Sequence, residues 1–129
     1  MTNKVLNELT ADDSYLILQL RMTDDTHHER YASMRELKRM GLEPNLSNYE
    51  AVYTAPLPGY STREGLLESL YIKFNSDYPA GYKGRSMSVS DIVAVKEGGR
   101  VTFYYVDSIG FEELPTFSKQ LQEANFTGE

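Results

Sequence analysis

The sequence predicts an α+β domain whose elements run β-α-β-α-β-β and form a small, mainly antiparallel sheet with two helices on one face. Three observations support this fold class. An apolar run beginning at Ser14 is typical of a buried strand, and residues 62–75 have apolar side chains at helical spacing. Gly98 and Gly99 separate two strand-like runs, which indicates a hairpin.

Length and composition favour one globular domain. The chain has 129 residues, of which 40% are hydrophobic and 25% charged, so a hydrophobic core is feasible without further support. We expect a flexible N-terminal arm at residues 1–13, a single domain at 14–117 and a polar C-terminal tail at 118–129. The absence of cysteine excludes disulfides, thiolate zinc sites and cysteine nucleophiles.

Charge and hydropathy limit the classes of partner. Nineteen acidic and thirteen basic residues give a net charge of −6, which disfavours binding to nucleic acid or an anionic membrane. No apolar run approaches the roughly 18 residues that span a bilayer, so we expect a cytoplasmic protein without a membrane segment. The locally basic segment 30–41 is interpreted as the solvated side of an amphipathic helix.

The first strand is expected in SYLILQLRM, residues 14–22, because acidic turns bound this apolar run. Thr26 and Glu29 then have the spacing of a capping box, which predicts a helix at about residues 27–40. Gly41 is placed to end that helix.

The second strand is expected in NYEAVYTAPL, residues 48–57, where apolar and polar side chains alternate before two prolines. Ser61 and Glu64 repeat the capping-box spacing and predict a helix at 62–75. The apolar stripe of this second helix consists of Leu66, Leu67, Leu70, Tyr71 and Phe74.

The hairpin is predicted from strands at residues 91–96 and 101–107, with positive φ at one or both glycines of the Gly98-Gly99 turn. Residues 111–114, FEEL, are expected to add a short edge strand. Ser88 and Asp91 have the spacing of a turn whose polar side chains satisfy backbone N–H groups.

The sequence contains no combination of residues that predicts a catalytic or metal-binding site. His27 and His28 lie among acidic residues, but adjacent histidines diverge on a helix and the chain has no third one, so capping is favoured over a metal site. The serines near Asp91 and Asp107 lack an evident base. We therefore assign no catalytic residue, no metal ligand and no cofactor.

Several segments together resemble the YodL-like family of small domains from Gram-positive bacteria and their mobile elements. The most specific are GRSMSVSDIVAV (84–95) and YYVDSIGF (104–111), with YLILQLR, NYEAVYTAPL and LLESLYIKFN in support. The resemblance implies an intracellular domain and supplies no catalytic residues. It marks a candidate signature surface at the following positions: Gly84, Ser86, Ser88, Asp91, Tyr105, Asp107, Gly110 and Phe111.

Three functions follow as hypotheses. The first is a non-enzymatic protein-interaction module of a mobile element, suggested by the missing active site and by the tyrosines near the hairpin. The second is a small hydrolase or transferase that uses Asp91 and Asp107, since a hairpin brings strand ends together. The third is an acidic inhibitor of a host defence nuclease, which the mild and dispersed charge disfavours. The expected partner is a protein.

Overall fold

The computed structural model describes residues 13–82 and 84–115. The expected tail and residues 1–12 of the expected arm lie outside this range. The elements, in chain order, are β1 (Ser14–Leu20), the 3-10 helix η1 (His27–Glu29), α2 (Met34–Arg39), the 3-10 helix η2 (Leu46–Asn48), β2 (Tyr49–Pro56), α3 (Arg63–Ser76), β3 (Ile92–Glu97), β4 (Arg100–Val106) and β5 (Phe111–Glu113).

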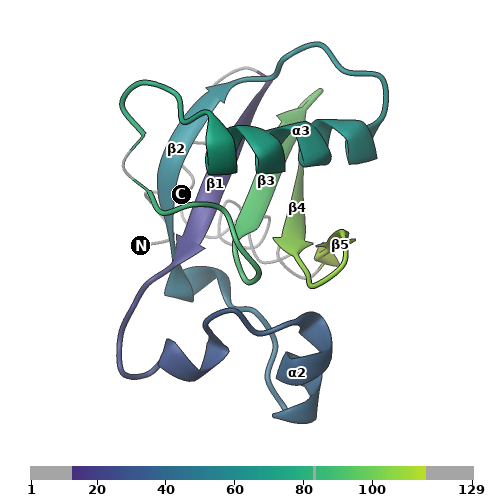
Figure 1. Cartoon of the computed structure of the whole chain (residues 1–129). Helices are drawn as coiled ribbons and strands as arrows, with labels where there is room; N and C mark the ends of the chain where they lie inside the picture. The colour runs from purple at the N-terminus through teal and green to yellow at the C-terminus, as the bar shows by residue number, and fades with distance from the viewer. Residues whose placement is uncertain (1–12, 83, 116–129) are drawn as a thin grey trace, which may run out of the picture.

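One antiparallel sheet organises the described chain, with strand order β2-β1-β3-β4-β5. Helix α3 crosses one face of this sheet, and α2 lies beyond one end of the strands (Figure 1). The predicted α+β class is therefore confirmed. The short edge strand expected in FEEL is present as β5.

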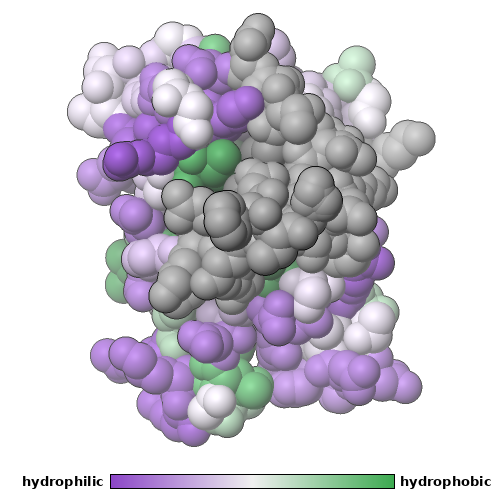
Figure 2. All heavy atoms as spheres, turned by 180° about the vertical axis from the view of Figure 1, so that it is seen from behind, coloured by the Kyte–Doolittle hydropathy of each residue, from purple (hydrophilic) through white to green (hydrophobic). Residues whose placement is uncertain are grey.

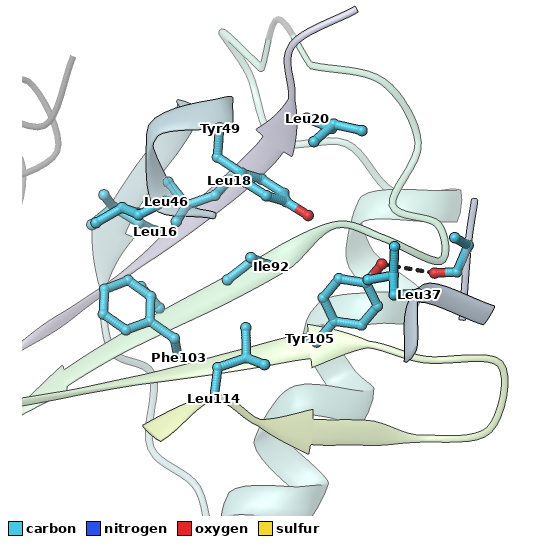
Figure 3. Packing of buried hydrophobic residues seen from close by; sticks show 12 residues of the cluster. Leu16, Leu18, Leu20, Leu37, Leu46, Tyr49, Ile92, Phe103, Tyr105 and Leu114 are labelled. Carbon is cyan, nitrogen blue, oxygen red and sulfur yellow. Dashed lines mark hydrogen bonds between the residues drawn. The ribbon is translucent and has the colours of Figure 1, made fainter. Parts of the chain in front are cut away.

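The centre of the sheet is apolar on both faces. All seven residues of β1 are buried, and the side chains of residues 15–18 alternate between two clusters. Leu16 and Leu18 belong to the cluster on the face away from α3, together with Phe103 of β4 (Figure 3). Tyr15 and Ile17 belong to the cluster beneath α3. A fully buried strand explains why β1 has no polar alternation in the sequence.

A bulge in β2 breaks the alternation expected from its sequence. Ile17 pairs with Tyr53 whereas Leu18 pairs with Ala51, so Val52 is the extra residue. As a result, Val52 and Tyr53 both pack against the cluster beneath α3, while Ala51 packs against the opposite cluster. The bulge thereby places the Tyr53 ring 5.4 Å from that of Phe74 on α3.

Helix α3 forms where the apolar stripe predicts it. Its N-cap is Thr62, whose hydroxyl accepts from Gly65 N, rather than the expected Ser61. Four of the five stripe residues are buried against the sheet, namely Leu66, Leu67, Leu70 and Phe74. Tyr71 is exposed instead, and Ile72 beside it is 63% exposed. The outward face of α3 therefore presents apolar side chains.

The β3–β4 hairpin closes through the two glycines as expected. Gly98 has φ 59° and Gly99 has φ 80°, values in the left-handed region that side chains with a Cβ rarely adopt. Two successive left-handed residues match the twist of the flanking strands and leave only these two residues between β3 and β4.

The first helix differs most from its prediction over residues 27–40. The structure has only a single 3-10 turn at 27–29, and α2 begins after Ser33. The Thr26 hydroxyl makes no capping bond, because it donates to Arg21 O and Thr23 O instead. The capping box forms seven residues later, between Ser33 and Glu36. The predicted box was therefore placed on the wrong Ser/Thr-x-x-Glu pair.

The two helices also differ from the expectation that they share a face. Leu37 of α2 packs with Tyr105 in the cluster on the face away from α3 (Figure 3). Helix α2 belongs to a long segment, residues 21–48, that leaves the sheet after β1 and returns at β2. Leu20 pairs with Tyr49 at its base, and Arg21 N donates to Asn48 O at 2.8 Å. We call residues 21–48 the α2 excursion.

The view from behind shows the face opposite to α3 (Figure 2). At the end that holds the α2 excursion, the visible described surface is mainly hydrophilic, with a small hydrophobic group between polar side chains. The four basic residues of the predicted helix, Arg30, Arg35, Lys38 and Arg39, are all exposed, in agreement with their interpretation as a solvated face.

Candidate functional site

Asp91 is the most deeply buried of the signature residues. Its side chain has no solvent exposure and lies just before β3. Oδ2 accepts hydrogen bonds from Ser88 N at 2.9 Å and from Gln19 Nε2 at 3.1 Å. Oδ1 is buried and has no hydrogen-bond partner among the described residues. Burial raises the pKa of Asp91 to about 6, against the opposing effects of these two donors and of the Arg85 charge.

Gln19 connects this carboxylate to the loop that precedes β3. It is the one polar residue within the apolar middle of β1, and it is 2% exposed. Its Oε1 accepts from Arg85 N at 2.9 Å, and its Nε2 donates to Arg85 O at 2.9 Å. The Arg85 guanidinium donates to Leu20 O. Sequence reasoning missed Gln19, although a lone glutamine in a buried strand signals a specific hydrogen-bond partner.

Gly84 is required here by close packing. A Cβ at this position would lie 2.6 Å from Tyr82 Oη and 2.8 Å from Gln19 Oε1. Neither atom can move freely, because Tyr82 Oη also donates to Arg85 O and its ring packs 4.9 Å from that of Phe74. The signature glycine therefore permits the loop to lie against β1.

Three hydrogen bonds dock the α2 excursion on the end of the sheet. Tyr105 Oη donates to Ala32 O at 2.7 Å, a bond drawn in Figure 3. Asp107 Oδ1 accepts from Met34 N, the first residue of α2, at 3.1 Å. Ser90 Oγ accepts from the backbone N of Tyr31 at 3.2 Å.

Ser90 is held in a left-handed conformation, with φ 89°. Its N donates to Val106 O and its carbonyl accepts from the hydroxyl of Tyr49. With the bond to Tyr31, three contacts thus determine an uncommon backbone geometry. Among the signature residues, Asp91, Tyr105 and Asp107 hold segments together through their side chains.

Replacing Asp107 tests this docking role. We expect Asp107→Ala to lower the free energy of unfolding by about 0.5–2 kcal/mol, because Met34 N loses its acceptor at the start of α2. Asp107→Asn should retain most of the stability, since its Oδ1 can still accept. Urea unfolding followed by circular dichroism measures both changes.

The exposed neighbour Ser108 supplies the control for that test. Ser108→Ala keeps the backbone N that donates to Asp107 Oδ1, so its effect should stay within about 0.5 kcal/mol. Equal effects of Asp107→Ala and Ser108→Ala would contradict the docking role of Asp107.

Three signature residues are instead placed at the surface. Ser86 is exposed and contacts the hydroxyl of Tyr78. Gly110, with φ 72°, closes the turn at residues 107–110, which we call the β4–β5 turn. Phe111 is half-buried at the start of β5. The candidate signature surface therefore divides into a buried framework and a small exposed part, with Gly110 and Phe111 at the β4–β5 turn and Ser86 beside Tyr78.

A groove lies between the outer side of α3 and the β4–β5 turn. Its volume is about 420 Å³. We call it the α3 groove. Its apolar lining includes Tyr71, Ile72, Val89 and Phe111. The tip of the turn presents Ile109, whose side chain is 92% exposed. Sequence reasoning missed both Ile72 and Ile109, because exposure of an apolar residue depends on tertiary packing.

A second groove lies on the other side of the same turn, toward α2, and has a volume of about 590 Å³. Its charged lining is mixed, with Arg35 and Lys38 as well as Glu43 and Glu112. Asp107 lines both grooves, and Asp91 lines neither. The two carboxylates of the hydrolase or transferase hypothesis thus share neither of these grooves.

The described residues include no group of three or more histidine and acidic side chains placed to hold a metal ion. The His27 and His28 rings lie 5.7 Å apart at 84° to each other, and Nδ1 of His27 contacts Asp24 O. Within the same part of the chain, no helix is long and apolar enough to cross a membrane.

Neither the curated proteins nor the solved structures contain a match to this chain. The model of one protein family, described as the YodL-like domain, matches residues 14–117. This range holds the whole described sheet, both helices and all eight signature positions. The chain therefore belongs to the YodL-like family.

Proposed function

We propose that this domain is a non-enzymatic protein-interaction module and that the α3 groove with Ile109 is its binding surface. The observation that carries the proposal is the exposure of Ile109. An isoleucine that is 92% exposed forfeits the burial that stabilises most such residues. Tyr71 and Ile72 line the groove together with Ser108 and Gly110, the two residues that flank Ile109. Exposed apolar side chains gathered around a groove are of the kind that marks interaction sites.

The rigidity of the β4–β5 turn supports this interpretation. Asp107 N donates to Gly110 O at 3.0 Å, and Ser108 N donates to Asp107 Oδ1 at 2.8 Å. The same Asp107 oxygen is fixed to α2. These bonds hold the backbone on both sides of Ile109, and a preorganised turn loses less conformational entropy on binding.

The burial of the other signature carboxylate also favours a binding role. A general acid or base must reach its substrate, whereas Asp91 is fully buried and hydrogen-bonded to structural groups. The setting that we propose, the cytoplasm of a bacterium with a mobile genetic element, follows from the family resemblance and not from the geometry.

Site-specific photo-crosslinking in cells tests the proposal. A photoreactive phenylalanine analogue at Ile109 should yield a discrete crosslinked product, because this side chain would lie within the interface. The matched control places the same analogue at Arg100, an exposed residue beside the β3–β4 turn.

The product at Ile109 should disappear in an Ile72→Ser background, which alters the opposite side of the groove. The absence of any product at Ile109, or the same products at Ile109 and Arg100, would contradict the assigned surface. Circular dichroism of each variant establishes that the domain is folded.

A further inference from the structure

The charged residues of the α3 groove all have the same sign. Among the described residues that line it, Glu68 and Asp107 are acidic and none is lysine or arginine. Glu68 forms no ion pair within the described chain, and the hydrogen bonds that Asp107 accepts from Met34 N and Ser108 N both use its Oδ1. The groove on the α2 side of the turn has both signs, so this acidic character is specific to one side.

The outer face of α3 orders these features along a line. Glu64, Glu68 and Ile72 are spaced four residues apart, so their side chains follow one another on the same helix face. All three are exposed. A partner that runs along α3 would therefore meet two carboxylates, one helical turn apart, and then an apolar contact.

The shape of the surface favours a macromolecular partner over a small ligand. A site for a small molecule encloses most of the ligand surface. Here Ile72 and Ile109 are 63% and 92% exposed, so the apolar area extends out of the groove and over its rims. A helix laid into such a groove would cover both rims.

Resting on the proposed function, we infer that the α3 groove binds a basic amphipathic helix of a partner protein. Lysine or arginine residues four positions apart on that helix lie opposite Glu64 and Glu68. A large apolar side chain one further turn along contacts Ile72 and Phe111 and packs beside Ile109. The ion pairs select the partner and the apolar contacts supply most of the affinity.

Synthetic helices provide a direct test with the intact chain. The probe is a fluorescent Leu/Lys peptide of about 16 residues, or roughly four helical turns, with leucine on one face and lysine on the other. A second peptide replaces every lysine by glutamate, and a third replaces every leucine by glutamine. Fluorescence anisotropy gives the dissociation constants.

We expect the Leu/Lys peptide to bind at least about tenfold more tightly than the Leu/Glu peptide, because attraction to two carboxylates is replaced by repulsion. The Lys/Gln peptide should bind weakly. Amide chemical shifts in the protein should change at Ile72 and Phe111 and not at Arg35 or Lys38, which line the other groove.

Variants of the protein separate the two contributions. Ile109→Ser should weaken the Leu/Lys peptide about tenfold or more, as for loss of a central apolar contact. Glu68→Gln should weaken it by about threefold and make its affinity less sensitive to salt. Glu112→Gln is the matched control, because it removes the same charge from the other groove and should leave binding unchanged.

The outcomes distinguish this inference from the proposed function. Equal affinity for the Leu/Lys and Leu/Glu peptides, or shift changes in the other groove, would overturn the basic partner. If crosslinking at Ile109 still captures a protein in that case, the proposed interaction surface is retained and only the basic chemistry of the partner is rejected. A crosslinked product with twice the mass of the chain would identify a second copy as the occupant and also overturn the inference.

Discussion

Phe74→Ala should lower the free energy of unfolding by about 3–5 kcal/mol, the range for truncating a buried phenylalanine. Phe74 has no solvent exposure. Its ring lies 6.2 Å from that of Tyr15, 5.4 Å from that of Tyr53 and 4.9 Å from that of Tyr82. These three residues come from β1, β2 and the loop before β3, so the ring joins α3 to segments that are distant in sequence.

Urea unfolding followed by far-ultraviolet circular dichroism measures this loss. The matched control is Ile72→Ala on the same helix, which should change stability by less than about 1 kcal/mol because that side chain is mostly exposed. If Phe74→Ala does not fold, Phe74→Leu should still fold with a smaller loss. A loss below about 1 kcal/mol for Phe74→Ala would show that the aromatic cluster is not the centre of the core.

Asp91 should make the protein less stable as the pH rises from about 4 to about 6. Burial raises the pKa of Asp91 from 3.8 to about 6, so in this interval the folded chain binds a proton that the unfolded chain has released. Stability falls with pH wherever the folded state binds more protons. A shift of this size corresponds to about 3 kcal/mol between the two ends of the interval.

The groups around Asp91 shift its pKa in both directions. Ser88 N, the Gln19 amide and the Arg85 charge favour the carboxylate, while burial favours the neutral acid and exceeds them. Burial raises the pKa values of Tyr49 and Tyr82, and the nearby Asp91 charge raises them further. The hydrogen bonds with Ser33 lower the pKa of Glu36. Glu36 therefore has the opposite effect to Asp91, because it stabilises the folded protein as the pH rises.

Comparison with Asp91→Asn isolates the contribution of this one group. The wild-type protein should gain about 2–3 kcal/mol relative to Asp91→Asn when the pH is lowered from 7.5 to 4, because only the wild type takes up the proton. Urea unfolding of both proteins at these two pH values gives the difference. If the difference in stability between the two proteins is the same at both pH values, Asp91 does not titrate in this interval.

The sequence was most informative where local signals determine the structure. The apolar stripe of α3 and the Gly98-Gly99 turn depend on spacing within one element. Four of the five stripe residues are buried as predicted, and the turn has the predicted positive φ values. Thr26 and Ser33 show the limit, because each begins a Ser/Thr-x-x-Glu pattern and only the second one caps a helix. The bond from Met34 N to Asp107, 73 residues away, helps to fix the helix start, and no local pattern reveals it.

The candidate site was predictable only in part, because local sequence signals do not identify contacts between distant residues. The signature segments drew attention to Asp91, Asp107 and the residues around them. Their partners could not be read from the sequence, because Gln19 lies 72 residues from Asp91 along the chain. The exposure of Ile109 depends on how the β4–β5 turn is fixed, which is again a property of tertiary contacts.

The α2 excursion is attached to the sheet in a way that should tolerate changes in its length. It leaves and re-enters the sheet at the paired residues Leu20 and Tyr49, so its two ends remain neighbours whatever lies between them. The entropic cost of closing such a segment rises only by about 0.6 kcal/mol for each doubling of its length. We therefore expect insertions or deletions at its exposed parts to leave the pairing of β1 with β2 and β3 unchanged.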